Sequence, residues 1–215
     1  MKTHNALETM KEVSLLLGRK EKFAFVTYTR SAIFSVTGEV KGEKKPPKQF
    51  TKLILDGLQE ENNYFVKAIQ PDLVKLSINK FKELFVNTND FYDPGFLEYY
   101  INNNYDVFKT FVSWYFKNTK AIVVSFQNES YINKYFSSDS TFIQVPYNDF
   151  YLKVDLITKE ILSKSNGIDT VFFDCPMLSS AIAYRIWSES NMSVIDLGRT
   201  LNAAKSIVKN NDSKK

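Results

Sequence analysis

From residue 120 onward the sequence alternates short apolar runs with segments of helical spacing, and this alternation strongly limits what the chain can fold into. Each apolar run is a predicted strand, followed by a polar loop and a predicted helix. Strands connected through helices are parallel, because right-handed crossovers return the chain to the same edge of the sheet. Strands are predicted at residues 121–126, 141–145, 170–173 and 193–197, and helices at 128–136, 149–162, 177–188 and 200–208.

This pattern predicts an α/β fold: a mostly parallel, doubly wound, Rossmann-like sheet with helices on both faces. The length of 215 residues suits one domain spanning residues 1–215. A Pro-Pro pair and several lysines predict a mobile surface loop over residues 38–48, and residues 209–215 are expected to form a flexible tail.

The first 120 residues have a less regular pattern. Helical spacing predicts a helix over residues 5–18, ending at a glycine suited to a C-cap, and another over 50–58. Aromatic and β-branched residues predict a buried strand at 23–28. Residues 70–93 fit a helix or a strand equally, so both remain open. Residues 95–117 are expected to form a helical region with a break near 102–104.

Composition excludes several classes of chemistry. The chain has one histidine, His4, and one cysteine, Cys175, so a histidine-based triad, a histidine zinc site or a thiolate cluster has no candidates in the body of the chain. A lone cysteine and no secretory leader indicate a cytoplasmic protein. No apolar run approaches the ~20 residues that a membrane-spanning helix needs. We therefore expect no membrane association.

Net charge says little about partners. A formal charge of +4 is compatible with a phosphate-bearing ligand or with DNA, but a modest lysine excess also keeps many proteins dispersed. Two nucleotide-binding signatures are absent from the sequence: no Gly-x-Gly-x-x-Gly follows a strand, and no Gly-x-x-x-x-Gly-Lys phosphate loop occurs. NAD enzymes and ATP enzymes of those types are disfavoured.

The candidate site lies where ligands gather in an open parallel sheet, outside the carboxyl ends of the strands. Asp174 and Asp196 each close an apolar strand, which favours a ligand role over simple helix capping. We expect the strand-end segments to meet in one cleft, where arginine and helix N-termini bind phosphate and carboxylates and amides bind sugar hydroxyls. The residues expected there are Thr29, Arg30, Ser31, Asn148, Asp174, Ser179, Asp196, Gly198 and Arg199.

Structural alternatives exist for several of these residues. For Asn128, Asp149 and Ser179 taken singly, a helix cap is the simpler explanation. Arg30 is also explained as the partner of a carboxylate at the edge of the core.

Several segments together resemble the glycosyltransferases of the GT-D fold and their phage-borne relatives. The clearest is DTVFFDCPMLSSAIAYRIWSESNMSVIDLGRTLN at residues 169–202, which is similar to that family's closing strand, helix and Asp-x-Gly pattern; Asp196 and Gly198 match the last of these. The segments FIQVPYNDFYLKVDLI at 142–157 and KQFTKLILDGLQ at 48–59 add to the likeness. The resemblance implies a GT-D-like fold and a nucleotide-sugar donor.

One departure from the family pattern concerns its metal. In the family, an Asp-x-Glu element after the first strand is associated with the divalent ion that holds the donor diphosphate. Here Arg30, Ser31 and Ala32 occupy those positions in FAFVTYTRSAIF, so both carboxylates are missing. Arginine and alanine supply no oxygen ligand for a divalent ion, so no metal ligand is assigned. Arg30 is expected to take over the charge of the metal instead.

The resemblance therefore implies a transferase that moves a sugar from a nucleotide-sugar donor to an acceptor. Asp174 or Asp196 would act as base or hydroxyl ligand. Thr29, Arg30, Ser31, Asn148, Ser179, Gly198 and Arg199 would contact the donor. The acceptor stays open. Phage DNA is one candidate, and the protein would then act in the host cytoplasm. Two alternatives also stay open: a catalytically inactive binding or assembly protein on the same scaffold, and a nucleic-acid-binding module.

Overall fold

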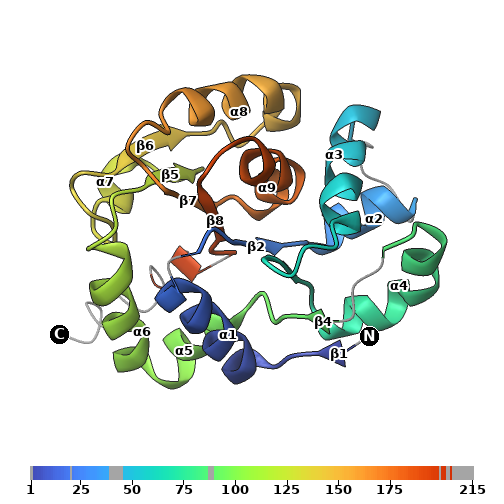
Figure 1. The fold of residues 1–215 in the computed structure, drawn as a ribbon, viewed down its shortest axis with the longest axis horizontal. Helices are drawn as coiled ribbons and strands as arrows, with labels where there is room; N and C mark the ends of the chain where they lie inside the picture. Colours follow the sequence, from blue (N-terminus) through green and yellow to red (C-terminus); the bar gives the residue numbers. More distant parts are fainter. Residues whose placement is uncertain are drawn as a thin grey trace.

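The protein is described by a computed structural model that covers residues 2–19, 21–38, 46–86, 90–198, 200–201 and 204. Its centre is a six-stranded sheet in which every pair of neighbours is parallel, and a two-stranded parallel sheet lies beside it (Figure 1). The strands are β1 Lys2–Thr3, β2 Ala24–Thr27, β3 Phe65–Ala68, β4 Asp90–Phe91, β5 Ile122–Ser125, β6 Thr141–Gln144, β7 Thr170–Asp174 and β8 Ser193–Asp196.

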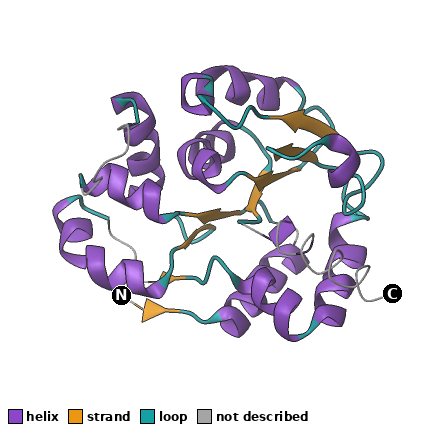
Figure 2. Cartoon of the chain, turned by 180° about the vertical axis from the view of Figure 1, so that it is seen from behind, coloured by secondary structure: helices purple, strands orange, loops and turns teal. Residues whose placement is uncertain are grey.

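The order across the large sheet is β3-β2-β8-β7-β5-β6, so all six carboxyl ends lie at one edge. Figure 2 shows the helices packed around this sheet. They are α1 Ala6–Arg19, α2 Arg30–Thr37, α3 Lys48–Gln59, α4 Pro71–Glu83, α5 Phe96–Asn103, α6 Tyr105–Phe111, the π-helical turn η1 Val112–Phe116, α7 Glu129–Ile132, the short 3-10 helix η2 Phe150–Leu152, α8 Val154–Ser163 and α9 Pro176–Glu189. The predicted α/β architecture is confirmed.

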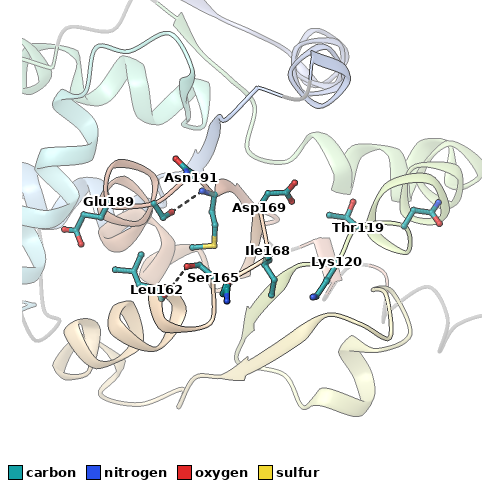
Figure 3. A pocket seen from close by; sticks show the side chains of 13 residues that line it. Thr119, Lys120, Leu162, Ser165, Ile168, Asp169, Glu189 and Asn191 are labelled. Atoms are coloured by element: carbon teal, nitrogen blue, oxygen red, sulfur yellow. Dashed lines mark hydrogen bonds between the residues drawn. The ribbon is translucent and has the colours of Figure 1, made fainter.

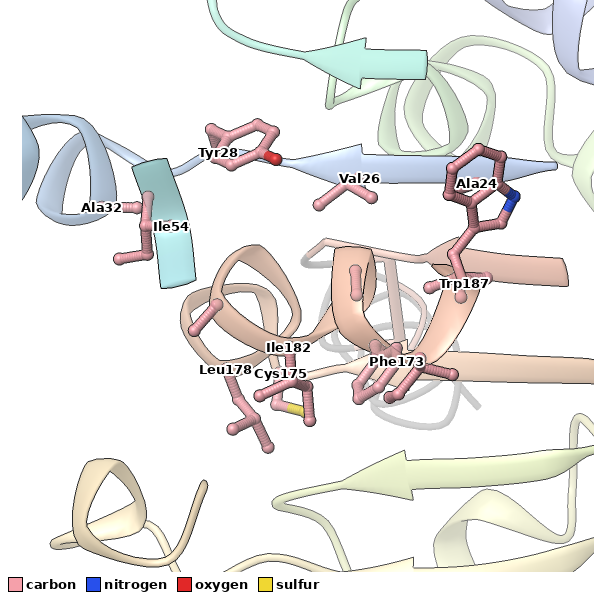
Figure 4. Close-up of a cluster of buried hydrophobic side chains, with 14 of the residues drawn as sticks. Ala24, Val26, Tyr28, Ala32, Ile54, Phe173, Cys175, Leu178, Ile182 and Trp187 are labelled. Atoms are coloured by element: carbon pink, nitrogen blue, oxygen red, sulfur yellow. The ribbon is translucent and has the colours of Figure 1, made fainter. Parts of the chain in front are cut away.

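Two hydrophobic clusters pack against opposite faces of the sheet. Successive side chains of a strand point to opposite faces, and accordingly Val124 and Phe173 belong to one cluster whereas Val123 and Phe172 belong to the other. The first cluster includes residues of α2, α3, α8 and α9, and the second includes residues of α1, α5, α6 and α7. Figure 4 shows part of the first cluster, including Phe173 of β7 and Ile182 of α9. We call these the α9 face and the α1 face.

Helix α9 is held near its C-terminus by Lys22, a residue distant in sequence. Near its C-terminus, Lys22 Nζ donates hydrogen bonds to the carbonyl oxygens of Trp187 at 2.7 Å and Ser190 at 3.0 Å. The same ammonium lies 4.9 Å from the centroid of the Trp187 ring. A cation next to the last carbonyls of a helix is favoured by the helix dipole. These contacts fix α9 relative to β2, which Lys22 precedes.

The structure decides between helix and strand in the 70–93 segment and corrects predictions for other segments. The described residues of the 70–93 segment contain the helix α4 and the short strand β4, and the expected break in the 95–117 region lies between α5 and α6 at Asn104. Sequence analysis missed β3. An Asn62-Asn63 turn followed by an apolar run indicates a strand here, but Lys67 interrupts the run. Gly18 does not cap α1, because the helix continues to Arg19.

Some predictions fall outside the described residues. These include most of the expected 38–48 loop, the tail at 209–215 and most of the helix at 200–208, of which Thr200, Leu201 and Ala204 are helical. Among the described residues, no helix combines the length and the apolar composition that a membrane span requires.

Candidate functional site

The carboxyl edge of the sheet contains a point where the chain leaves neighbouring strands in opposite directions. From β5 the chain continues to β6 on one side, and from β7 it continues to β8 on the other, although β5 and β7 are neighbours. In open parallel sheets, ligands bind at such a switch point because diverging connections leave a crevice between the strand ends. The residues that end these two strands, Ser125 and Asp174, are paired in register.

Asp174 reaches this point from the last position of β7. Its Oδ2 accepts a hydrogen bond of 2.9 Å from Ser125 Oγ, which joins the ends of β7 and β5. The side chain is only 4% exposed, and its Oδ1 is buried with no hydrogen-bond partner within the described part of the chain. A buried, unpartnered carboxylate oxygen is costly, since its lone pairs have lost their hydration, and such a cost in a folded protein points to a functional group.

Asp196, the last residue of β8, is instead fully engaged by its own surroundings. Oδ1 accepts from the Gly198 amide at 2.8 Å, and Oδ2 accepts from the Thr27 amide at 3.2 Å and from the hydroxyl of Ser179. These donors come from β2, from α9 and from the loop after β8. The carboxylate therefore ties three elements together at the strand ends.

The two carboxylates do not lie on the same side of the sheet. Asp174 follows Phe173, whose side chain packs on the α9 face, so strand alternation directs Asp174 to the α1 face. Asp196 points to the α9 face, where it meets Ser179 of α9. The expectation that both would face one cleft is therefore wrong: they share the carboxyl edge but project from opposite faces.

Both carboxyl groups have a raised pKa. Burial raises the pKa of Asp174 from 3.8 to about 7, with a further contribution from the charge of Asp196, while the Ser125 hydrogen bond opposes the rise. Burial likewise raises the pKa of Asp196 to about 7, against the hydrogen bonds from Ser179, Gly198 and Thr27. A carboxyl group with a pKa near 7 can exchange a proton at neutral pH.

The junction of β2 and α2 holds the predicted phosphate-binding residues. Thr29 caps α2, since its Oγ1 accepts from the Ala32 amide at 3.2 Å, and this hydroxyl also lies 3.7 Å from the sulfur of Met177 in the first turn of α9. The N-termini of α2 and α9 are thus neighbours. Arg30 and Ser31 are exposed in the first turn of α2, and Arg30 makes no ion pair with a carboxylate of the described residues. The ion-pair alternative for Arg30 is therefore not seen.

Asn148 lies apart from these residues, exposed in the loop after the edge strand β6. Its neighbour Tyr147 is 78% exposed and contacts Phe126, which follows β5, with ring centroids 5.4 Å apart. Asp149 has a left-handed backbone at φ 58° and caps no helix with its side chain; its Oδ1 accepts from the Tyr151 hydroxyl at 3.0 Å. The helix predicted at 149–162 is accordingly a short 3-10 turn followed by α8.

The structure settles the remaining capping alternatives. Asn128 does cap α7, because its Oδ1 accepts from the Tyr131 amide at 3.0 Å. Ser179 is not a cap, since its hydroxyl donates to Asp196. Gly198 adopts φ 58° and its amide binds Asp196, while Arg199 lies outside the described residues.

Sequence reasoning missed Ser125 and Thr27 as partners of the two carboxylates. Ser125 was visible as a hydroxyl at the end of an apolar strand, but its pairing with Asp174 depends on β5 and β7 being neighbours. Thr27 contributes through its backbone amide, which no side-chain pattern reveals. The lone cysteine, Cys175, is fully buried next to Asp174 on the α9 face.

A pocket of about 880 Å³ lies at the opposite edge of the sheet (Figure 3). It is lined mainly by residues of the loops that precede β5, β7 and β8, among them Lys120, Asp169 and Asn191. This amino edge is not where open parallel sheets bind their ligands. Among the described residues, no group of three or more histidine, cysteine, aspartate or glutamate side chains is arranged to hold a metal ion.

No protein-family model and no curated protein matches this sequence. Solved structures do match its fold. A selenomethionine-substituted structure of domain of unknown function 1792 superposes with a TM-score of 0.76 at 10% identity, covering 98% of this chain and 82% of that one. A new glycosyltransferase (DUF1792) from Streptococcus sanguinis gives 0.75 at 10% identity, covering 98% and 85%.

A further structure of domain 1792, described as having a distinct glycosyltransferase fold, gives a TM-score of 0.70 at 10% identity, covering 98% of this chain and 82% of that chain. Agreement over almost the whole chain at so low an identity concerns the path of the backbone. The expected GT-D-like fold is confirmed. The chain therefore has the distinct glycosyltransferase fold of the domain 1792 structures.

Proposed function

We propose that this protein is a GT-D-like glycosyltransferase that moves a sugar from a nucleotide-sugar donor to an acceptor hydroxyl. The observation that carries the proposal is Asp174: a buried carboxylate at the switch point, with one oxygen unpartnered among the described residues. The fold it shares with structures described as glycosyltransferases supports the same conclusion. Fold alone does not establish activity, so the case depends on this site.

In this proposal Asp174 is the catalytic base. It takes the proton of the acceptor hydroxyl while that oxygen forms a bond to the anomeric carbon and the bond to the nucleoside diphosphate breaks. A pKa of about 7 suits this role, because the carboxylate is then a competent base at neutral pH. Asp196 has a positioning role, since its three hydrogen bonds fix the ends of β2 and β8 and the start of α9.

The diphosphate would bind at the β2–α2 junction. Arg30 and Ser31 are exposed there in the first turn of α2, next to the first turn of α9. A helix N-terminus and a guanidinium both favour an anion, and the guanidinium can bind phosphate in bidentate fashion. Thr29, Ser179 and Gly198 shape this part of the edge, while Arg199 remains a predicted donor contact.

The metal associated with the Asp-x-Glu element does not fit here. Arg30 brings a positive charge to that position, and Ala32 is fully buried and has no ligand atom. We therefore propose a transfer without a metal ion, in which the Arg30 guanidinium neutralises the negative charge on the departing diphosphate.

Thermal unfolding with a panel of nucleoside diphosphates and nucleotide sugars tests the donor. One nucleotide should raise Tm by several degrees, because a ligand that binds only the folded state stabilises it. The shift should persist with a chelator and be lost in Arg30→Ala. Arg19→Ala is the matched control, since Arg19 is exposed at the end of α1, which precedes β2 at the other edge of the sheet.

Three results would contradict the proposal. No shift with any nucleotide would favour an inactive binding or assembly protein. A shift that chelator abolishes would contradict metal-free binding. An unchanged shift in Arg30→Ala would remove the role assigned to that guanidinium.

A further inference from the structure

We infer that the amino edge of the sheet carries a second binding site, which takes an uncharged oligosaccharide chain and is separate from the transfer site. It consists of the pocket in Figure 3 and a hollow beside Trp114, and we call the two together the amino-edge surface. The inference goes beyond the proposed function and does not depend on it, because the transfer site lies at the carboxyl edge.

The pocket has the size and the lining of a sugar-binding site. Its volume of about 880 Å³ falls within the range of ligand pockets, roughly 300–1,000 Å³. Figure 3 shows Thr119 and Lys120 on one side of it and Ser165 and Asn191 on the other. A sugar ring has hydroxyl groups around its rim and C–H groups on its faces, so it matches a lining that mixes uncharged polar and apolar groups. The uncharged polar side chains are Asn118, Thr119, Ser165, Asn166, Ser190 and Asn191, and Leu162, Ile168 and Met192 add apolar surface.

Two amide side chains of this lining are available to a ligand. Asn166 and Asn191 are exposed, and neither side chain makes a hydrogen bond within the described part of the chain. Each amide offers two N–H donors and a carbonyl acceptor. The Ser165 hydroxyl already donates to the carbonyl oxygen of Leu162 at 2.7 Å, so it is left as an acceptor. The pocket thus presents donors and acceptors together, as a ligand rich in hydroxyl groups requires.

A hollow of about 470 Å³ beside Trp114 adjoins the pocket. The Trp114 side chain is 61% exposed in the π-helical turn η1, whereas Val112 and Phe116 of the same turn are buried. The two hollows are neighbours, because Asn118 lines the pocket and its Nδ2 donates to the carbonyl oxygens of Ser113 and Trp114 at 3.0 Å each. Turns of this kind are rare and often occur at functional sites, and an exposed indole ring can stack on the C–H face of a sugar. A chain of several sugars could therefore run from the pocket onto Trp114.

The charges of the amino-edge surface are balanced, which favours an uncharged ligand. Its described lining contains two cations, Lys109 and Lys120, and two carboxylates, Asp169 and Glu189. Glu189 is in addition paired with Arg185 at 2.9 Å. A nucleic acid would need several cations for its phosphates, because phosphate contacts supply much of its affinity. A basic peptide would equally need several free carboxylates.

The amino-edge surface is too distant from Asp174 to take part in the transfer. Asp169 lines the pocket and Asp174 comes five residues later, at the other end of β7. At about 3.3 Å per strand residue, the two are about 17 Å apart. The surface therefore anchors a saccharide chain and leaves its chemistry unchanged.

Tryptophan fluorescence reports on this surface directly. The chain has two tryptophans, and Trp187 is only 8% exposed, so a quencher in solution reaches mainly Trp114. The probes are maltotetraose, cellotetraose, triacetylchitotriose and a galactose tetramer. A galacturonic acid tetramer and a single-stranded DNA oligonucleotide are the charged counterparts. At least one uncharged oligomer should bind to the full chain and protect Trp114 from quenching by acrylamide.

Substitutions measured by titration calorimetry test the assignment of residues. Trp114→Ala should weaken oligosaccharide binding about tenfold, the loss expected for one aromatic partner. Asn191→Ala should weaken it about fivefold, the loss expected for one hydrogen bond. Both side chains are exposed, so both variants should keep the Tm of the wild type. Tyr147→Ala and Asn148→Ala are the matched controls, because they remove an exposed ring and an exposed amide after β6 at the carboxyl edge, and they should bind as the wild type does.

Four results would overturn the inference. They are no binding of any uncharged oligomer, binding that leaves Trp114 open to acrylamide, loss of binding in the carboxyl-edge controls but not in Trp114→Ala and Asn191→Ala, and Trp114-dependent binding of a charged probe alone. The nucleotide thermal shift should be the same in Trp114→Ala as in the wild type. Failure of the transferase proposal would abolish that shift and leave oligosaccharide binding intact, so the two proposals fail separately.

Discussion

Replacing Asp174 by asparagine should stabilise the protein at alkaline pH. The substitution keeps the size and one oxygen acceptor for Ser125 but removes a charge that burial disfavours. The wild-type carboxyl must ionise above its pKa of about 7 in the folded state, whereas it ionises near 3.8 when exposed. Asparagine never carries this charge, so its stability should not fall as the wild type's does.

The magnitude follows from the shift in pKa. A rise of about three units corresponds to ~4 kcal/mol, taken at 1.36 kcal/mol per unit. This is an upper value, since the substituted amide also has to be accommodated. Because the pKa is raised by folding, the folded state holds its proton more tightly than the unfolded state does. This contribution to stability is complete below about pH 4, declines as the pH rises towards 7, and is absent above that.

Urea denaturation followed by tryptophan fluorescence measures the effect. At pH 8, Asp174→Asn should exceed the wild type by ~2–4 kcal/mol in free energy of unfolding. Lowering the pH to 5 should narrow this difference by ~2–3 kcal/mol, because the wild type gains its proton. Asp139→Asn, which changes an exposed carboxylate in the turn before β6, is the control and should stay within ~0.5 kcal/mol of the wild type.

One result would refute the reasoning. If Asp174→Asn were no more stable than the wild type at pH 8 and followed the same pH dependence, Asp174 would not be a buried carboxyl with a raised pKa. Its assignment as the base would then lose its physical basis. In an active preparation the same variant should lose sugar transfer, and the wild-type rate should fall below about pH 7 as Asp174 becomes protonated.

Two further predictions concern the groups that hold the strand ends. Ser179→Ala removes a hydroxyl donor from the buried Asp196 and should lower the free energy of unfolding by ~1–2 kcal/mol at neutral pH, measured by urea denaturation. Ser180→Ala is the control: it loses only a hydrogen bond to its own helix and should lower the free energy of unfolding clearly less. Equal losses in the two variants would contradict the stabilising role of the bond from Ser179 to Asp196. Gly198→Ala should lower the free energy of unfolding by ~1–2 kcal/mol, because the residue has φ 58° and a new Cβ would lie 3.4 Å from a backbone carbonyl oxygen. Gly18→Ala is the control: the new Cβ would lie in open space within α1, so stability should be unchanged or higher. A rise in stability for both variants would refute the backbone argument.

Much of the fold could be predicted because it depends on local pattern. In the second half, each strand is an apolar run bounded by polar loops, so β5 to β8 were found within a residue or two. The failures share a cause. The strand β3 is short and carries Lys67. The helix α2, which sequence analysis did not predict, has only eight residues and begins shortly after β2. In both places the pattern was too brief to be decisive.

The candidate site was predicted in composition and not in arrangement. Asp174, Ser179, Asp196 and Gly198 were identified because they follow apolar strands or begin a helix. The pairing of Asp174 with Ser125 and of Asp196 with Ser179 could not be foreseen, because it depends on which strands are neighbours. The separation of the two carboxylates onto opposite faces likewise depends on the register of each strand.

What the sequence by itself determined is the order of strands and helices in the second half of the chain, since periodicity and turn residues act over a few positions along the chain. Only the tertiary structure decided that β5 lies beside β7 and that Asp174 has an oxygen without a partner in the described chain. It also decided that Tyr147 stands exposed two strands away. The physical reason is that burial, and with it the pKa of a carboxyl group, depends on neighbours that are distant in sequence.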